Sequence, residues 1–170
     1  TDEGELPFQY YFVRRRCEPR FVSIHFAGAE QARISPGLAA ALADPALEAV
    51  VVCPSNPVLS IGPFLAVAEI AAALRARRVP CVAVSPFIGG EAVKGPAAKI
   101  MRELGEEPGA ASLVGHYAGI VDAVLCDHAD PAAGQTLDGI AFHAADTLMR
   151  DDAGQQRLGR EVLALARGLA

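Results

Sequence analysis

Compact polar side chains follow the first strongly apolar run of the sequence. Residues 49–53 are apolar and mostly β-branched, and the next ten residues contain Ser55, Asn56 and Ser60 among three prolines. Proline fixes φ, so this loop is stiff. A stiff loop that presents hydroxyl and amide groups near a helix N-terminus suits an anion or the edge of a heterocycle. In the alternative interpretation it is a rigid connector whose polar groups cap one another; Ser60 is the predicted N-cap of the following helix.

A glycine pair and a lysine follow a second apolar run, residues 81–84. Gly89 and Gly90 allow positive φ and close approach of the backbone to a ligand. Lys94 stands just before the Gly-Pro that opens a helix, where a lysine opposes the helix dipole. A bound anion therefore explains this lysine better than helix stability does; the alternative is a surface lysine lying over the loop. The spacing matches neither a Walker A loop nor the GxGxxG dinucleotide motif.

Both loops are predicted to lie at one edge of a parallel sheet. Ligands of open α/β sheets bind beyond the carboxyl ends of the strands, and adjacent parallel strands bring their following loops side by side. We therefore expect a pocket for a phosphorylated ligand. Its predicted substrate contacts are Ser55, Asn56, Ser60, Gly89, Gly90 and Lys94. No Ser/His/Asp or Cys/His signature is visible, so no catalytic residue is assigned, and no carboxylates have metal-ligand spacing.

The elements that must position these loops alternate between strands and helices. Short apolar runs predict strands buried on both faces, and Ser, Pro or Gly marks several helix ends. The predicted strands are residues 21–26, 49–53, 81–85, 123–127 and 140–143, with 49–53 central in the sheet. The predicted helices are residues 6–16, 35–44, 62–77, 96–104, 112–119, 131–137 and 151–169, with Asp146-Thr147 as a further N-cap. This order indicates a Rossmann-like, three-layer α/β fold, a mostly parallel sheet with helices on both faces, formed by residues 1–170 as a single unit.

Composition and charge limit the classes of function. The chain has 170 residues, 52% of them hydrophobic, and a formal net charge of −5. This excludes a disordered chain and argues against broad binding to nucleic acid or an anionic membrane. No apolar stretch reaches the roughly 20 residues of a membrane helix. Cys17, Cys53, Cys81 and Cys126 form no CxxC pair, and the last three are predicted to be buried reduced thiols, which suits a cytoplasmic protein.

At the two loops the sequence resembles a known family. The segments that carry the resemblance are residues 53–63, CPSNPVLSIGP, and residues 84–96, VSPFIGGEAVKGP. Supporting segments are FQYYFVRR at residues 8–15 and DTLM at residues 146–149. The motifs are long and the match runs over nearly the whole chain. The sequence is similar to the 2-phospho-L-lactate transferases, the CofD-like family of deazaflavin coenzyme F-420 biosynthesis.

The resemblance implies a transfer reaction. Members of the family move a phospho-lactyl or phospho-enolpyruvyl group from a guanosine-diphosphate-linked donor to the hydroxyl of the deazaflavin Fo, release GMP and need Mg²⁺. A diphosphate suits backbone N–H groups, a cation and a metal, because phosphoryl transfer depends on positioning and charge stabilisation. By carry-over, Lys94 would neutralise phosphate charge, and Ser55 and Asn56 would orient the nucleotide or the flavin-like ring.

The chain departs from the family pattern in length. The family is about twice as long, and its first half carries the glycine-rich nucleotide loop and the acidic residues expected to hold Mg²⁺. We therefore expect this chain to be a C-terminal portion, incomplete as a sheet and as an enzyme. Family members commonly form dimers, so a homodimer is one assembly that the resemblance allows; the sequence itself does not give the oligomeric state.

Two other classes of function stay open at this point. A sister family with a related fold binds nucleotide sugars and acts as a regulatory protein, and a structural oligomerisation fragment would bind no ligand. A ligand that binds the folded state raises its melting temperature. Stabilisation by GDP with Fo would indicate the transferase, and stabilisation by a UDP-sugar would indicate the regulatory protein.

Overall fold

The sheet of the computed structural model, which describes residues 1–89, 91–92 and 95–170, has five strands. They are β1 (Val50–Val52), β2 (Cys81–Val84), β5 (Ala123–Asp127), β6 (Thr136–Leu137) and β7 (Ile140–Ala145). Their order is β1-β2-β5-β7-β6, with all neighbours parallel except β6, which is antiparallel to β7. A separate ribbon pairs β3 (Phe87–Ile88) with β4 (Glu91–Ala92). The predicted, mostly parallel α/β sheet is confirmed.

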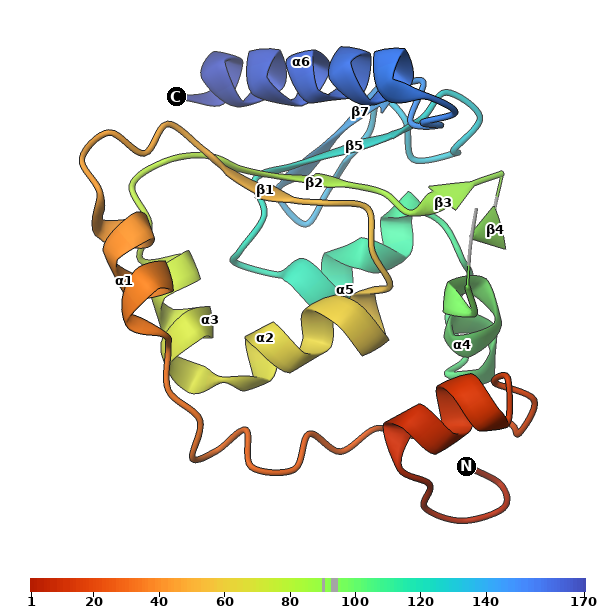
Figure 1. Cartoon of the computed structure of the whole chain (residues 1–170). Helices are drawn as coiled ribbons and strands as arrows, with labels where there is room; N and C mark the ends of the chain where they lie inside the picture. The colour runs from red at the N-terminus through yellow and green to blue at the C-terminus, as the bar shows by residue number, and fades with distance from the viewer. Residues whose placement is uncertain (90, 93–94) are drawn as a thin grey trace.

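Helices cover both faces of this sheet. The long helix α6 (Asp152–Leu169) lies along one face, and the remaining helices lie on the other side (Figure 1). The other α-helices are α1 (Pro36–Ala43), α2 (Gly62–Ala66), α3 (Ala68–Arg75), α4 (Ala97–Glu103) and α5 (Leu113–Tyr117). Three short helices of other types are η1 (Tyr10–Arg14), η2 (Pro57–Ile61) and η3 (Ala110–Ser112). The three-layer arrangement therefore agrees with the prediction.

The apolar runs of β2 and β5 bury alternate side chains on opposite faces. Val82, Val84 and Leu125 pack with Leu158 and Val162 of α6. The neighbouring residues of the same strands, Cys81, Ala83, Val124 and Cys126, belong to the larger core on the other face. Because both faces are covered, every residue of such a strand must be apolar, which explains runs without polar alternation.

Local sequence signals set several helix ends. The Ser35 hydroxyl oxygen accepts the Leu38 N–H at 3.3 Å at the start of α1, and the Asp151 carboxylate accepts the Gly154 N–H at 2.7 Å at the start of α6. Gly105, with a φ of 80°, follows the end of α4 in the left-handed conformation that glycine adopts at little cost. The predicted ranges for these three helices are confirmed.

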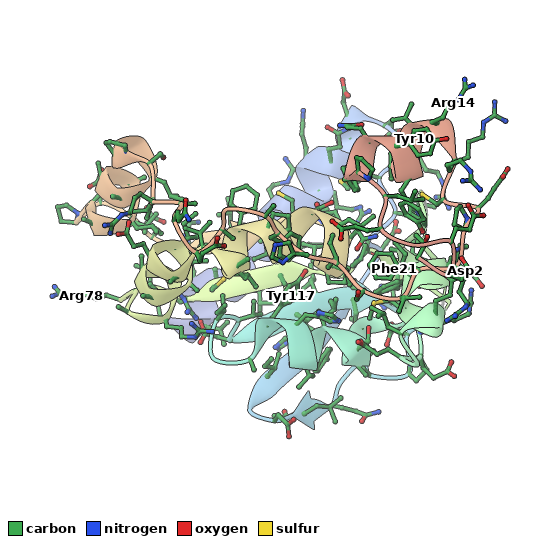
Figure 2. The ribbon with its side chains drawn as sticks, turned by 90° about the horizontal axis from the view of Figure 1, so that it is seen from below. Asp2, Tyr10, Arg14, Phe21, Arg78 and Tyr117 are labelled. Carbon is green, nitrogen blue, oxygen red and sulfur yellow. The ribbon has the colours of Figure 1, made fainter. Side chains whose placement is uncertain are left out.

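The first 26 residues do not join the sheet, and residues 19–21 bond to α4. The Phe21 N–H donates to a carboxylate oxygen of Glu103 at 2.9 Å, and the Lys99 ammonium donates to the Pro19 carbonyl at 3.1 Å. The strand predicted at residues 21–26 is therefore wrong, because these residues pair with no described strand and the Phe21 N–H bonds to a side chain of α4. Before it, η1 confirms the predicted N-terminal helix, with Tyr10 and Arg14 on its outer surface (Figure 2).

The helix predicted over residues 62–77 is broken into α2 and α3. Val67 has an extended conformation, with φ of −81° and ψ of 109°, and the helical stretches on its two sides are bent by 91°. Ile34 donates its N–H to Glu69, and Arg33 pairs with the same carboxylate, so the start of α3 is tied to the segment before α1. Helix propensity, high as it is in this alanine-rich stretch, is overridden by tertiary contacts of this kind.

A hairpin replaces the helix predicted at residues 131–137. Asp138 and Gly139, with φ of 48° and 82°, connect β6 to β7 in the two-residue turn typical of an Asp-Gly pair. Residues 146–149, where Asp146-Thr147 was the predicted N-cap, are also not helical. The cap of the last helix is Asp151 instead.

β1 lies at the edge of the sheet, although the sequence predicts a central strand. It pairs with β2 on one side, no described strand pairs with its other side, and Val51 is consequently 40% exposed. Cys53, at the end of this run, is exposed, so the prediction of a buried thiol there is wrong. Cys81 and Cys126 are buried as predicted, and burial raises the pKa of each thiol to about 11.

No single helix in the described part of the chain is long and apolar enough to cross a membrane. The bent pair Pro57–Ala66 and Ala68–Arg75 meets the length and composition together. Ile70 and Ala71 of this pair are buried in the protein.

Candidate functional site

A pocket of about 220 Å³ lies where β1 and β2 end. The two strands are adjacent and parallel, so their carboxyl ends meet at one edge of the sheet, the place where ligands of such sheets bind. The pocket is lined by residues 54–56, by Ser85, Pro86 and Ile88, by Ala97 of α4 and by residues 147–149. Three loops that are distant in the sequence thus form one cavity.

Asn56 shapes the first wall of the pocket. Its side-chain oxygen accepts the N–H groups of Val58 and Leu59, at 2.9 and 3.0 Å, and so caps η2. Asn56 is therefore the cap of this turn, whereas Ser60, the predicted cap, lies inside η2 and is exposed. The Asn56 amide nitrogen is buried and has no partner. The residue is held by its oxygen, and its two N–H donors remain unused.

Ser85 forms the second wall, directly after β2. It is 2% exposed, its N–H donates to the Leu125 carbonyl at 2.8 Å, and its hydroxyl oxygen accepts the Phe87 N–H at 3.2 Å. These bonds fasten the residue to the neighbouring strand β5 and begin the turn into β3. The Ser85 hydroxyl therefore makes a structural hydrogen bond, and the residue also lines the pocket.

Thr147 forms the third wall, in the chain that leaves β7 toward α6. Next to it, the Asp146 carboxylate accepts the Leu148 N–H at 3.2 Å and pairs with Arg157 of α6 at 3.0 Å. Thr147 itself is 5% exposed, and its hydroxyl oxygen has no partner. Since α6 packs over β2, the segment returns across the end of the sheet to the loops of β1 and β2.

The structure brings together only some of the predicted site residues. Ser55 and Asn56 line the pocket with the loop after β2, so the expected meeting of the two strand tips is observed. Gly89 has the expected positive φ, 58°, but like Ser60 it is exposed and is not part of the pocket wall. Gly90 and Lys94 lie outside the described residues.

Ser85 and Thr147 are the site residues that the sequence reasoning missed. Ser85 directly follows a buried strand, a position that favours a site residue. Thr147 follows the last parallel strand in the same way, but it was interpreted as part of a helix cap. The position of a residue just after a parallel strand was the available signal in both cases.

The described pocket wall is mostly apolar, with four polar residues and no charge. None of the described residues that line it has an ionisable side chain, and its remaining walls are proline, alanine and aliphatic groups. Among the residues that the structure describes, no group of three or more His, Cys, Asp or Glu could hold a metal ion. These residues alone therefore suit a neutral polar group and do not fit Mg²⁺.

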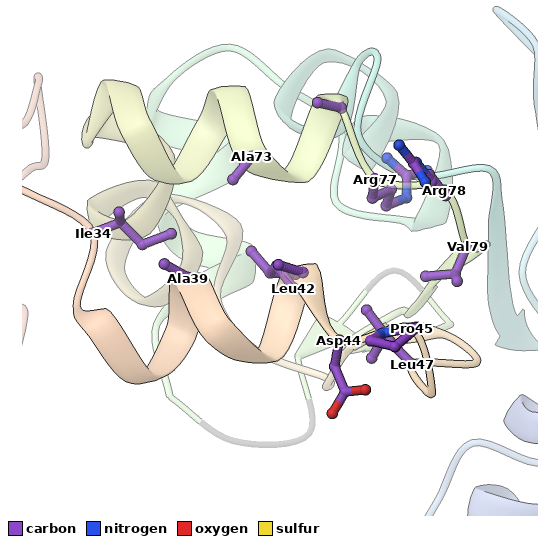
Figure 3. A pocket seen from close by; sticks show the side chains of 12 residues that line it. Ile34, Ala39, Leu42, Asp44, Pro45, Leu47, Ala73, Arg77, Arg78 and Val79 are labelled. Atoms are coloured by element: carbon purple, nitrogen blue, oxygen red, sulfur yellow. The ribbon is translucent and has the colours of Figure 1, made fainter.

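A larger groove, of about 640 Å³, lies at the opposite, amino end of the strands. Apolar residues of α1 and α3 form its walls, and Arg77 and Arg78 lie at one end (Figure 3). Arg77 is already engaged, since it donates to the Leu74 carbonyl at 2.8 Å and pairs with Asp122. Because ligands of open α/β sheets bind at the carboxyl ends, the smaller pocket is the stronger candidate.

Comparison with known proteins identifies the family. The model of the family described as 2-phospho-L-lactate transferase CofD matches residues 1–166. The chain belongs to this family. A 2-phospho-L-lactate transferase of Methanopyrus kandleri is 40% identical over 99% of this chain and 54% of its own length. A phosphoenolpyruvate transferase of Streptomyces avermitilis is 38% identical over 94% of the chain and 50% of its own length.

The chain spans about half the length of the curated CofD relatives that it matches. A 2-phospho-L-lactate transferase of Halobacterium salinarum, 39% identical over 94% of the chain, is covered over 45% of its length. The predicted resemblance to the CofD family is confirmed. Of the two other classes left open by the sequence, neither the nucleotide-sugar regulator nor the ligand-free fragment is favoured by these relatives.

Proposed function

We propose that this chain forms the substrate-binding C-terminal part of a CofD-type transferase. The reaction would move a phospho-lactyl or phospho-enolpyruvyl group from a guanosine-diphosphate-linked donor to the hydroxyl of the deazaflavin Fo, with release of GMP. Membership of the family supports the reaction class. The pocket between the loops of β1 and β2 carries the proposal, because the two motifs of the resemblance meet there. Relatives with both kinds of transferase name match the chain, so the choice of three-carbon group stays open.

The proposed contacts divide into two groups. Ser55 and Asn56 are supported by their place in the pocket wall and would orient a ring of a substrate. Ser60, Gly89, Gly90 and Lys94 are proposed from the motifs alone, and Lys94 would supply the positive charge that a diphosphate needs.

Mg²⁺ is a proposed cofactor of the complete enzyme. When bound, it would stabilise the charge that develops on the transferred phosphoryl group. Since the described residues contain no group of three or more His, Cys, Asp or Glu, its proposed ligands are the acidic residues that the resemblance implies for the first half of family members. The proposed site is thus composite, and a homodimer and a cytoplasmic location remain predictions.

Ligand-dependent melting of this chain tests the proposal. We expect Fo or GDP to raise the melting temperature by mass action, and a UDP-sugar to leave it unchanged. The measurement should be repeated after addition of the amino-terminal half of the Methanopyrus kandleri relative, when release of GMP can also be followed. Stabilisation by the UDP-sugar, with no effect of Fo or GDP in either setting, would refute the transferase.

A further inference from the structure

Two buried polar atoms without a partner belong to residues that line the same pocket. Among the described residues, four buried side-chain nitrogen or oxygen atoms lack a hydrogen-bond partner, and two of them are the Asn56 amide nitrogen and the Thr147 hydroxyl. Buried polar groups are nearly always paired, because an unpaired one has lost its bond to water without replacement. Two such atoms in one cavity point to a ligand that completes both.

The role of each atom is limited by its chemistry. The Asn56 oxygen already accepts two backbone N–H groups, so only its N–H donors are left for a ligand. A threonine hydroxyl can both donate and accept. The ligand must therefore offer an acceptor to Asn56, and it can offer either a donor or an acceptor to Thr147.

The walls select a neutral, flat group. Pro54, Pro86, Ile88 and Leu148 supply apolar surface, and none of the described lining residues is charged. A cavity of about 220 Å³ is below the roughly 300–1,000 Å³ of sites for whole drug-sized ligands, so it holds one ring system. A diphosphate would place charge in this cavity without a counterion from the described walls.

From these observations we infer that Asn56 and Thr147 are a specificity pair for the lactam edge of a neutral heterocycle. The ring carbonyl accepts from the Asn56 amide, and the adjacent ring N–H donates to the Thr147 hydroxyl. This assignment rests on the proposed function only for the identity of the ring. Both the deazaflavin Fo and the guanine of GDP present such an edge, and the test separates them.

The primary test uses uracil, the smallest common ring with this edge, as a probe in NMR titrations of this chain. The side-chain amide signal of Asn56 is assigned by its loss in Asn56→Ser, which keeps a capping oxygen because serine caps as well as asparagine. Uracil should shift this signal, and 1,3-dimethyluracil, which lacks the ring N–H, should not. If neither compound or both compounds shift the signal, the lactam assignment is wrong.

Variants then separate binding from folding. Thr147→Val should weaken uracil binding about tenfold, the loss of one hydrogen bond, while the free chain melts no lower than the parent because an unpaired hydroxyl is removed. Thr147→Ser should retain the affinity within about threefold, since it keeps the hydroxyl. Thr136→Val, the same change at an exposed threonine of β6, is the matched control. A lower melting temperature with unchanged affinity in Thr147→Val would make Thr147 merely structural.

Titration calorimetry with Fo and with GDP identifies the ring. The substrate whose affinity falls in Thr147→Val and Asn56→Ser is the occupant, and the other should bind these variants as it binds the parent chain. If both variants bind Fo and GDP like the parent, the specificity pair is refuted while the transferase stands. If neither substrate binds, to the chain alone or after addition of the amino-terminal half of the relative, but uracil acts as expected, the proposed function fails and the lactam site stands.

Discussion

Replacement of Asp130 by alanine should destabilise the chain strongly, although the residue does not line the pocket. Asp130 is 4% exposed, and its carboxylate accepts the N–H of Ala110 at 2.8 Å and of Ala132 at 2.9 Å. These bonds hold η3 against the loop after β5. Each hydrogen bond to a charged acceptor contributes about 1.5–3 kcal/mol, and the change leaves two buried N–H groups unpaired. The variant no longer buries a carboxylate, and this gain offsets part of the cost of the lost hydrogen bonds. We therefore expect the free energy of unfolding to fall by about 3 kcal/mol.

Thermal unfolding followed by circular dichroism measures this effect. A loss of about 3 kcal/mol corresponds to a fall in melting temperature of about 6–12 °C for a chain of this size. Asp127→Ala is the control, because the Asp127 carboxylate accepts one N–H, from Ala129 at 3.0 Å, in an exposed turn. It should cost less than about 1 kcal/mol. Equal melting temperatures for the two variants would refute the claim that burial and double acceptance make Asp130 special.

Two further predictions concern the thiols. Burial raises the pKa of Cys81 and of Cys126 from 9.0 to about 11. The pKa of each thiol is higher in the folded chain than in the unfolded chain, so the contribution of each thiol to stability is complete below about pH 9. As the pH rises from about 9 toward 11, the free energy of unfolding falls by up to about 1.4 kcal/mol per pH unit for each thiol. The melting temperature should fall over this range, and a flat profile would contradict the burial of these thiols. On the native chain, a maleimide should label one thiol, that of Cys53, because the other three cysteines are buried. The Cys53→Ser variant should stay unlabelled until it is unfolded. Rapid labelling of that variant would show that a buried cysteine is accessible.

Local patterns in the sequence predicted most of the helices and strands. The runs at β2 and β5 are apolar throughout because both faces of the sheet are covered, and this identifies parallel strands without knowledge of their partners. Ser35 and Gly105 mark helix ends through bonds and φ angles within a few residues. An Asp-Gly pair at 138–139 signalled the hairpin equally locally, and it was overlooked.

Contacts between distant segments decided the rest. An apolar run does not show which strand pairs with it, so β1 was expected at the centre and lies at the edge. Residues 21–26 have the alternation of a strand, but Glu103, 82 positions away from Phe21, accepts the first N–H instead of a sheet partner.

The same division holds for the candidate site. The sequence determined that Ser55 and Asn56 follow an apolar strand, because strand ends and their loops are contiguous in the chain. Only the tertiary structure brought Thr147 to the same cavity, because the path of the chain from β7 to α6 depends on how α6 packs across the sheet. It also decided which atom of Asn56 is used for capping and which is left for a ligand, since that depends on bond geometry that residue types do not encode.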